Sequence, residues 1–508
     1  MKVMSSNISE RATVLSKPRR WAALAVLIFP VLLISVDNTV LSFAVPAITS
    51  ALSPSGNQLL WIIDIYPLVL AGLLVPMGSF GDRIGRRRLL LIGATGFALV
   101  SAVAAFATDA NQLVAARALL GIFGAMLMPA TLSLIRTIFP DATERRTAIA
   151  VWAAAFSGGA VLGPIVGGLL LEHFWWGSVF LMAVPMLLPL LIGGLILVPE
   201  SKDPNPGRVD PLSIVLIIFT LLPFTYAIKT FATAPWFVIL GAVAVAVISG
   251  VAFVQRQLKQ ETPMLDVRLF KNAAFSGALM VNLIGVFSLV GFIYFVSQHL
   301  QLIAGLSPIE AGLWMTPGLV LTMLFGLIAV GLSRRFGSPN IMAVGLVFSA
   351  IAYTLVMVAG EGSNAVLLMV AFAVLGTGIG MTETLSNDMT LAAVPASKAG
   401  AASAISETAY EIGSVLGVAV LGTILNSVYS SRLLVPGSLS QDQAELAGET
   451  LGGAHQVASS LGGSDAQSLI ESAAQAFDHG VLLTSSIAAA LSLVAAVLVF
   501  RVIKPAIR

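Results

Sequence analysis

Long apolar runs, separated by short polar segments, recur along the whole chain. A helix needs about 20 apolar residues to cross a bilayer, and we find fourteen runs near that length. The run that contains Pro223 and the run after it carry the weakest signal. The pattern predicts an all-α integral membrane protein with fourteen transmembrane helices, at residues 21–45, 59–80, 89–107, 113–135, 147–171, 178–198, 211–231, 236–254, 275–297, 311–332, 341–359, 365–386, 404–426 and 481–500.

The composition fits a chain whose main solvent is lipid. Of its 508 residues, 57% are hydrophobic and only 10% are charged, whereas a soluble domain carries about 25% charged residues. The mean hydropathy of +0.95 points in the same direction. These values exclude a disordered protein and argue against a soluble enzyme.

The residue types used in metal, redox and nucleophilic sites are scarce. The chain has no cysteine, which excludes disulfides, thiol nucleophiles and iron–sulfur clusters. Its four histidines are too scattered for a metal motif. The phosphate-cradling loop, the nucleophile elbow and the HExxH motif are also missing. We therefore expect no metal, no cofactor and no enzymatic activity.

Basic residues set the orientation of the predicted helices, because cytoplasmic loops are enriched in Lys and Arg. If the N-terminus is cytoplasmic, all but three of the 27 Lys and Arg residues fall in cytoplasmic segments. The exceptions are Arg117 inside a span, Lys229 at an outer rim and Arg432 outside. We expect both ends of the chain to be cytoplasmic, and the first apolar run to be an uncleaved membrane helix.

Residues 427–480 form one long segment outside the membrane. The segment is acidic, and Ser440 and Ser464 are positioned as helix N-caps. Apolar residues between 469 and 477 fall at helical spacing. We expect a helical hairpin over the outer face, with a mobile acidic loop as the alternative.

One loop occurs in similar form in both halves of the chain. A shift of 252 residues aligns Arg83 with Arg335 and Gly85 with Gly337. Internal repeats are typical of transporters, whose substrate site lies between the two halves. We expect four parts: a cytoplasmic tail 1–20, an N-lobe 21–199 with helices 1–6, inserted helices 7 and 8 within 200–272, and a C-lobe 273–508 with helices 9–14 and the extracellular segment 427–480.

Three neighbouring parts of the first half carry motifs. The loop after the second span, 78–88, reads GSFGDRIGRRR, in which the glycines allow a tight turn. Arg117 lies inside the fourth span, where an arginine either has a partner or reaches the interface. In the fifth span small residues stack on one face for close helix packing, and a proline adds a kink that is able to act as a hinge. These residues are Gly159, Gly163, Pro164, Gly167 and Gly168.

In this order the motifs resemble the signature of the major facilitator superfamily. The segments 35–40 (SVDNTV) and 60–66 (LWIIDIY) resemble its fourteen-helix drug:proton antiporter subfamily, and within it the exporters of quaternary ammonium compounds. The resemblance implies two six-helix lobes that rock around a central cavity and couple proton entry to drug exit. It also implies a conformational latch at Asp82, Arg83 and Arg86, and a proton-relay or structural role for Arg117. Arg334 stands at the repeat position of Asp82, so we expect an asymmetric latch.

Carboxylates within the spans are the candidate chemistry. Burial favours the protonated form of a carboxylate, and the ionised form attracts an organic cation. Asp37 lies 17 residues past Arg20, roughly 25 Å along a helix, and Asp64 lies at a similar depth in the second span. The alternatives are polar packing with Asn38 and Thr39 for Asp37, and a position at the outer interface for Asp64.

A second acidic site is expected on the thirteenth span. Glu407 and Glu411 are four residues apart and share one helix face. Two such charges cannot both ionise cheaply in lipid, so we expect one of them to be protonated near pH 7. The alternative is that Glu407 reaches cytoplasmic water. We assign proton coupling and cation binding to Asp37, Asp64, Glu407 and Glu411, with Glu383 and Asp388 as secondary candidates.

Aromatic faces attract organic cations. Five aromatic residues lie near the predicted acids in sequence or on neighbouring spans, and we expect them to line a cavity: Trp61, Trp152, Phe156, Phe295 and Tyr410. Most other Trp and Tyr residues lie at span ends, where they are typical of interfacial belts.

Together these features predict a multi-pass protein of the cell membrane that exports lipophilic organic cations, such as quaternary ammonium compounds and ethidium, in exchange for protons. The cavity is expected to open to one side of the membrane at a time, and this alternating access moves the organic cation across. The alternative is the same fold with a narrow substrate such as a metabolite, a siderophore or a tetracycline-like drug. The expected partners are cationic drugs, protons and the lipid bilayer. We expect no nucleic acid partner, and a monomer as the working unit.

Overall fold

The computed structural model describes residues 15–203, 210–261, 263–359, 365–395 and 399–503. Fourteen helices in these ranges are long and apolar enough to cross a membrane, which confirms the predicted fold class and number of spans. Both weakly predicted spans are among them, and Pro223 lies within its helix without ending it. Predictions that concern residues 1–14, 204–209 and 504–508 lie outside the described residues.

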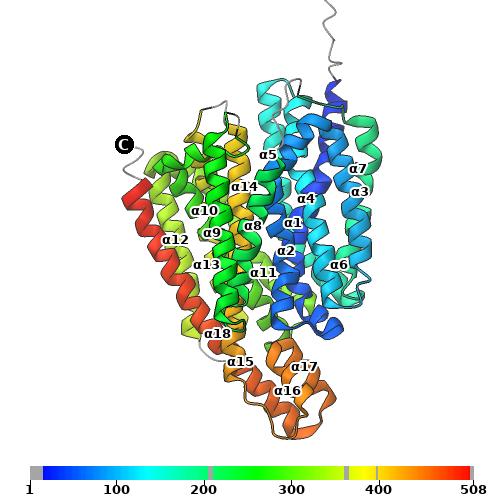
Figure 1. Ribbon diagram of the computed structural model, residues 1–508, viewed down its shortest axis with the longest axis vertical. Coiled ribbons are helices and arrows are strands. Elements are labelled where there is room, and N and C mark those ends of the chain that lie inside the picture. The colour runs from blue at the N-terminus through cyan, green and yellow to red at the C-terminus, as the bar shows by residue number, and fades with distance from the viewer. Residues whose placement is uncertain (1–14, 204–209, 262, 360–364, 396–398, 504–508) are drawn as a thin grey trace, which may run out of the picture.

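The first six spans form one bundle (Figure 1). They are α1 (Lys17–Leu52), α2 (Gly56–Ile84), α3 (Arg86–Ala104), α4 (Ala110–Ile138), α5 (Ala142–His173) and a sixth span made of α6 (Ser178–Leu181) and α7 (Ala183–Leu197). In this bundle α1 packs against α5 and α7, and α4 packs against α2 and α3. We call it the N-bundle.

The last six spans form the second bundle, the C-bundle. It consists of α10 (Ala273–Gln298), α11 (Pro308–Phe336), α12 (Ser338–Ala359), α13 (Ala365–Ala392), a thirteenth span of α14 (Ala399–Leu416), the π-helical segment Gly417–Gly422 and α15 (Thr423–Arg432), and finally α18 (Gly463–Leu498). Here α13 packs against α10, α11 and α12, and α10 packs against α14. Short π-helical segments inside helices are frequent at functional sites.

The predicted repeat has a counterpart in the backbone. Gly85 joins α2 to α3 with φ of 112°, and Gly337 joins α11 to α12 with φ of 82°. A side chain is strained at such angles, so glycine permits the abrupt turn at both places. The two loops aligned by sequence therefore make the same kind of turn.

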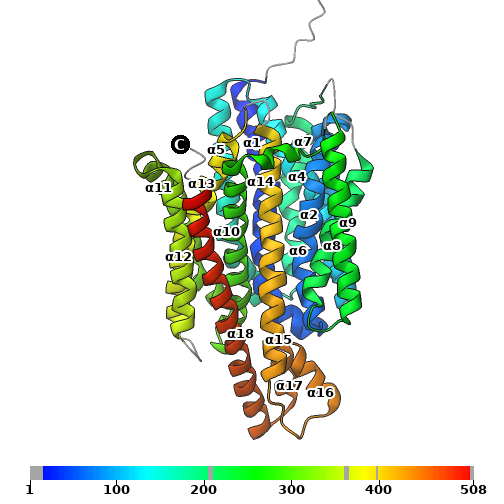
Figure 2. The same cartoon turned by 60° about the vertical axis from the view of Figure 1, so that its left-hand side comes forward.

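Two helices lie beside both bundles. α8 (Pro211–Lys229) and α9 (Trp236–Lys259) pack against each other, and α8 contacts α2 and the π-helical segment of the thirteenth span. They stand together at one edge of the molecule (Figure 2). Much of the surface of both helices is exposed. We call them the inserted pair.

The outer segment is helical, as predicted. α16 (Gln441–Glu449) and α17 (Leu451–Ser460) form a hairpin between the outward ends of α15 and α18 (Figure 1). Ser440 caps α16 with a reciprocal capping box, as expected. The prediction for Ser464 is wrong. α18 begins at Gly463, which has φ of 69°, and Gly462 is its N-cap, so Ser464 already lies in the first turn.

Candidate functional site

Asp37 and Arg117 form a buried ion pair inside the N-bundle. Arg117 Nη1 donates to Asp37 Oδ2 at 2.7 Å, and its Nε donates to the Ile62 carbonyl at 3.1 Å. The Arg117 guanidinium also lies over the ring of Tyr66, 4.5 Å from its centre. The Arg117 side chain is only 2% exposed. Arg117 therefore has an internal partner, and the alternative in which it reaches the interface is wrong.

A second ion pair joins the inserted pair to the N-bundle. Lys229 Nζ lies 3.0 Å from Asp64 Oδ2, and both side chains are almost completely inaccessible. Lys229 is the last residue of α8, as its predicted place at the end of the span requires, but its side chain turns toward α2 instead of toward water. Asp64 is likewise fully buried and is not an interfacial residue. Among the described residues, Arg117 and Lys229 are thus the buried Lys and Arg side chains of the spans.

Three glutamates lie on two helices of the C-bundle. Glu411 on α14 is buried, and its Oε2 has no hydrogen-bond partner among the described residues. Its charge interacts with those of Glu407 and Asp37, and Glu407 in turn interacts with Glu383 on α13. Glu383 and Glu407 are half-buried. The structure thus brings α1, α13 and α14 together around four carboxylates, which we call the acid cluster: Asp37, Glu383, Glu407 and Glu411.

Asp388 lies apart from this arrangement. It is exposed near the C-terminal end of α13, so it is not one of the buried acids.

Aromatic rings cross from the N-bundle to the acid cluster. Trp152 stacks on Phe156 at 6.4 Å, and Phe156 meets Tyr410 edge-on at 6.2 Å. Tyr410 lies within electrostatic range of all three glutamates. Phe295 is different, because it is 2% exposed and packs against Phe292 at 4.8 Å in the core of the C-bundle. Tyr410 is therefore near the acids, and Phe156 and Trp152 extend from it into the N-bundle.

The space beside Asp37 is small. A cavity of about 20 Å³ lies between the bundles, enough for a single water molecule. Its lining is mostly N-bundle, with two residues from the C-bundle: Asp37, Asn38, Leu41, Ser42, Ile63, Pro67, Arg117, Val290 and Ser414. This space leaves no room for an organic cation directly beside Asp37.

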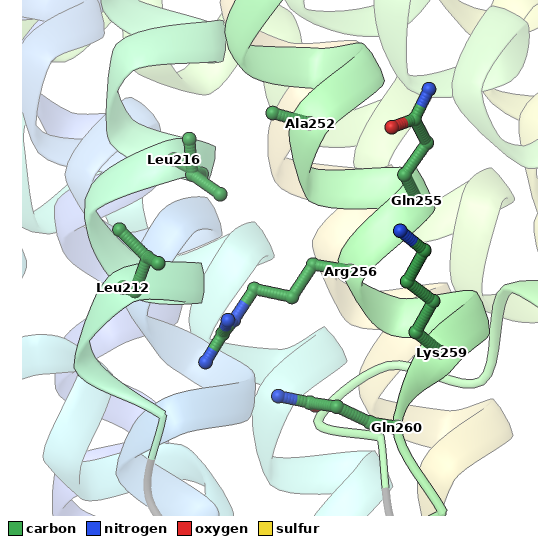
Figure 3. Close-up of a pocket in the computed structure, with 7 residues that line it drawn as sticks. All are labelled: Leu212, Leu216, Ala252, Gln255, Arg256, Lys259 and Gln260. Atoms are coloured by element: carbon green, nitrogen blue, oxygen red, sulfur yellow. The ribbon is translucent and has the colours of Figure 1, made fainter.

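A larger hollow of about 420 Å³ lies elsewhere, between the inner ends of α8 and α9 (Figure 3). Arg256 projects across it from α9 toward α8, where it makes two hydrogen bonds to Asp210, at 2.7 and 2.9 Å. The bonds from Arg256, and others from Ser213 and Gln260, hold the pKa of the Asp210 carboxyl well below its usual range. This network joins the N-terminal end of α8 to the C-terminal end of α9.

Several hydrogen bonds join the bundles at the end that the sequence predicts to be outside. Ser297 Oγ donates to the Ser42 carbonyl at 2.9 Å, and Gln301 donates to the Phe43 carbonyl at 3.2 Å. On the outer segment, the Glu449 carboxylate accepts a 2.7 Å bond from the Gly56 amide at the start of α2. The outer side of the seam is therefore shut in this conformation.

The described contacts of the predicted latch lie within the N-bundle and the segment that follows its sixth span. Arg86 Nη2 lies 2.8 Å from Asp82 Oδ1, and Arg83 is exposed. Arg86 also donates to Ser201 Oγ at 3.1 Å, and the Arg87 amide donates to Glu200. Sequence reasoning missed Glu200 and Ser201. Glu200 comes just after the sixth span, on the same predicted side of the membrane as the four arginines of the loop 78–88. This arrangement was a usable signal for an ion pair.

The glycines of α5 allow close packing on two sides. A Cβ at Gly159 would lie 2.8 Å from Ser35 Cβ, and one at Gly168 would lie 2.6 Å from Ile309 Cα. Gly163 and Gly167 likewise face Thr39 and Val40 of α1. α5 is thus wedged between α1 of its own bundle and α11 of the other.

Comparisons with known proteins agree with this architecture. The family model described as Major Facilitator Superfamily matches residues 27–418. The chain is 53% identical over 489 residues to the multidrug efflux pump LfrA of Mycolicibacterium smegmatis, covering 96% of this chain and 97% of that protein. It is 38% identical over 477 residues to the methyl viologen resistance protein SmvA of Salmonella typhimurium, covering 92% and 95%.

Among solved structures, the chain is similar to a bacterial homologue of the human lysosomal transporter Spinster, solved in an inward-facing, unoccupied conformation. The TM-score is 0.66 at 19% identity, and the match covers 96% of this chain and 99% of that one. At this identity the likeness concerns the fold. The sequence matches confirm the resemblance that the motifs predicted.

Proposed function

The chain belongs to the major facilitator superfamily, and on this premise we propose that it is a proton-driven multidrug exporter of lipophilic organic cations in the cell membrane. The observation that carries the proposal is the acid cluster. Among the ion pairs of the described residues, only Asp37 of these four carboxylates has a cation beside it, Arg117. Such an excess of acids inside a membrane protein is costly unless protons or cations neutralise it.

Protons and organic cations compete for the acid cluster, and this competition couples proton entry to cation export. An organic cation that enters from the cytoplasm is favoured when Glu407 and Glu411 are ionised, so its binding releases protons. After the seam opens outward, protons from outside re-occupy the carboxylates and the cation leaves. Because neither ligand is held well while the other is bound, each cycle exchanges one for the other.

The two bundles are the proposed moving parts. They rock about the seam between α2 and α14 and between α5 and α11, and the monomer contains the whole pathway. The latch residues Asp82, Arg83 and Arg86, with Glu200, stabilise the cytoplasmic end of the N-bundle as it moves. The small residues of α5 serve as the hinge against α1 and α11.

The relatives favour a broad range of cationic substrates over a narrow one. LfrA is a multidrug efflux pump and SmvA is a methyl viologen resistance protein. Methyl viologen is a flat, aromatic dication, the kind of ligand that carboxylates and aromatic rings attract. Cationic drugs and dyes, rather than a single metabolite, are therefore the proposed cargo.

Transport in liposomes tests the proposal. The purified protein is reconstituted, an inside-acid pH gradient is imposed, and uptake of ethidium is followed with and without a protonophore. Protonophore-sensitive uptake of ethidium and of a second, unrelated cation is expected. Uptake of one compound only would favour the narrow substrate, and no uptake by folded protein would contradict proton-coupled export of organic cations.

A further inference from the structure

Lys229 occupies a site on α2 that has the parts of a cation-binding site. Its Nζ lies 3.0 Å from Asp64 Oδ2, donates to the Leu60 carbonyl at 2.8 Å and lies 4.0 Å from the centre of the Trp61 ring. A carboxylate, a carbonyl and an aromatic face are groups that hold organic cations in proteins. We call the site formed by Leu60, Trp61 and Asp64 the α2 box.

The α2 box lies where three parts of the molecule meet. Ile65 and Leu68 of α2 pack against Val415 of the thirteenth span in one apolar cluster. Leu221 and Leu222 of α8 join the same cluster. Tyr294 of α10 is within electrostatic range of Asp64. A change in how the bundles meet therefore alters the surroundings of the box.

We propose that Lys229 is a tethered competitor of the transported cation: it fills the α2 box while the outer side is closed, and an organic cation takes its place when the end of α8 withdraws. This inference rests on the proposed function and gives the inserted pair a part in export. Lys229 cannot leave alone at low cost, because an uncompensated carboxylate in a buried site is strongly unfavourable. Exchange with an incoming cation avoids that cost.

The position of Lys229 makes such an exchange mechanically simple. It is the last residue of α8, and Thr230 follows as the C-cap. Withdrawal therefore needs movement of one helix end, without unwinding the helix. Much of α8 is exposed, and one of its closer approaches to α2 is at Gly72, opposite Ile218 and Leu221. The last turn of α8 is itself buried, at Ala227, Lys229 and the C-cap Thr230, so the contacts of this one turn must break for Lys229 to leave the box.

Equilibrium binding of ethidium to the full-length protein in lipid nanodiscs, at pH 8, tests the inference. Lys229→Gln removes the competitor, so we expect the dissociation constant to fall about tenfold if Lys229 fills the box about nine-tenths of the time. Adding Asp64→Asn should remove this gain and weaken binding below the wild-type level. Lys229→Arg restores a tethered cation and should return the affinity to the wild-type value. Lys259→Gln, at an exposed lysine near the end of α9, is the matched control and should change nothing.

An unchanged dissociation constant in folded Lys229→Gln would overturn the inference. The ion pair of Lys229 and Asp64 would then have only a structural role, here called a strut. If Lys229→Gln does not fold, the neutral double variant Asp64→Asn/Lys229→Gln decides, because it leaves no unpaired buried charge. A strut predicts wild-type affinity for that variant, whereas a binding box predicts weaker binding. If the wild type itself neither binds nor transports ethidium, the proposed function fails as well. If the wild type transports ethidium and Lys229→Gln leaves the dissociation constant unchanged, this inference alone is wrong.

Discussion

The buried acids differ in what neutralises them. Asp37 is paired with Arg117 and Asp64 with Lys229, whereas no ion pair of the described residues includes Glu411. A carboxylate already paired with a fixed cation responds less to a mobile one. Glu411, with Glu407 one turn away, is therefore the part of the acid cluster most open to exchange between a proton and a cation.

Removing one charge from either bundle should stop coupled transport. Asp37→Asn frees Arg117 from its partner, and Glu407→Gln removes a carboxylate that protons and cations share. We expect each variant to lower the initial rate of gradient-driven ethidium uptake by at least about tenfold, with normal amounts of protein in the liposomes. Asp388→Asn, at an exposed acid of α13, is the matched control. Full activity of both variants would refute the site assignment.

Residue spacing along the helices predicted where several acids of the site lie, but not what they pair with. Glu407 and Glu411 share a helix face because of their four-residue separation, and the depth of Asp37 followed from its distance to Arg20. The partner of Asp64 was not predictable. A lysine at the end of an apolar run usually extends to the interface, and only the packing of α8 against α2 decides that Lys229 turns inward.

At the scale of single elements, α5 links the two bundles. It packs against α1 through Gly159, Gly163 and Gly167, and against the first turn of α11 at Gly168. The neighbours at Gly168 are backbone atoms of Pro308 and Ile309, which cannot move aside as a flexible side chain can. The outer closure of the seam therefore depends on the absence of a side chain at this position.

Gly168→Val should hold the outer side open. Because the chain has no native cysteine, Ser42→Cys provides a single labelling site behind the closed outer contacts. We expect a membrane-impermeant maleimide, added from outside, to label this cysteine about tenfold faster in the Gly168→Val background, a change equivalent to about 1.4 kcal/mol. Gly158→Val, with open space around it on the same helix, should leave the labelling rate unchanged. Equal rates in the two backgrounds would contradict this role for α5.

The inserted pair should show a pH-dependent stability that originates at its cytoplasmic end. Arg256, Ser213 and Gln260 hold the pKa of Asp210 below its usual range, which is about 3.9 in an unfolded chain. The ionised carboxylate therefore stabilises the fold fully above about pH 4 and loses this effect as pH falls through the lower folded value.

Asp210→Asn should accordingly lower the melting temperature at pH 7, and the difference from wild type should shrink as the pH falls below about 4. Thermal unfolding of the purified protein between pH 7 and pH 3 measures this difference. A gap that stays constant over the whole range would show that the charge of Asp210 contributes nothing.

Element boundaries were less predictable than element types. The hydrophobic pattern located all fourteen spans, but the last one begins at Gly463 and not near residue 481, because its outer extension packs against α17 instead of lipid. Such an extension carries too many polar residues to be recognised as part of a membrane helix.

For the whole molecule, the outer segment ties the two bundles together. Glu449 contacts the first residue of α2, and Gly452 of α17 lies against Thr49 of α1. Both contacts cross from the C-bundle to the N-bundle on the side that must open to release cargo. Export therefore requires that these contacts break in each cycle.

A disulfide across this contact should trap the protein. A Cβ at Gly452 would lie 3.0 Å from the Cβ of Thr49, close to the roughly 3.5–4.5 Å that a disulfide needs. We expect Thr49→Cys/Gly452→Cys to lose ethidium transport on oxidation and to regain it on reduction. Each single cysteine variant is a control and should respond to neither treatment. Transport by the fully oxidised protein would show that the outer contacts stay closed throughout the cycle.

The central claim is that protons and organic cations compete for the same carboxylates, and proton release on binding tests it most directly. Ethidium is added to the purified protein in weakly buffered solution near neutral pH, and the change in pH is recorded. We predict acidification that saturates with ethidium binding and is lost or strongly reduced in Glu411→Gln. Saturable binding without any release of protons would contradict the account, because the cation would then occupy a site that protons do not share.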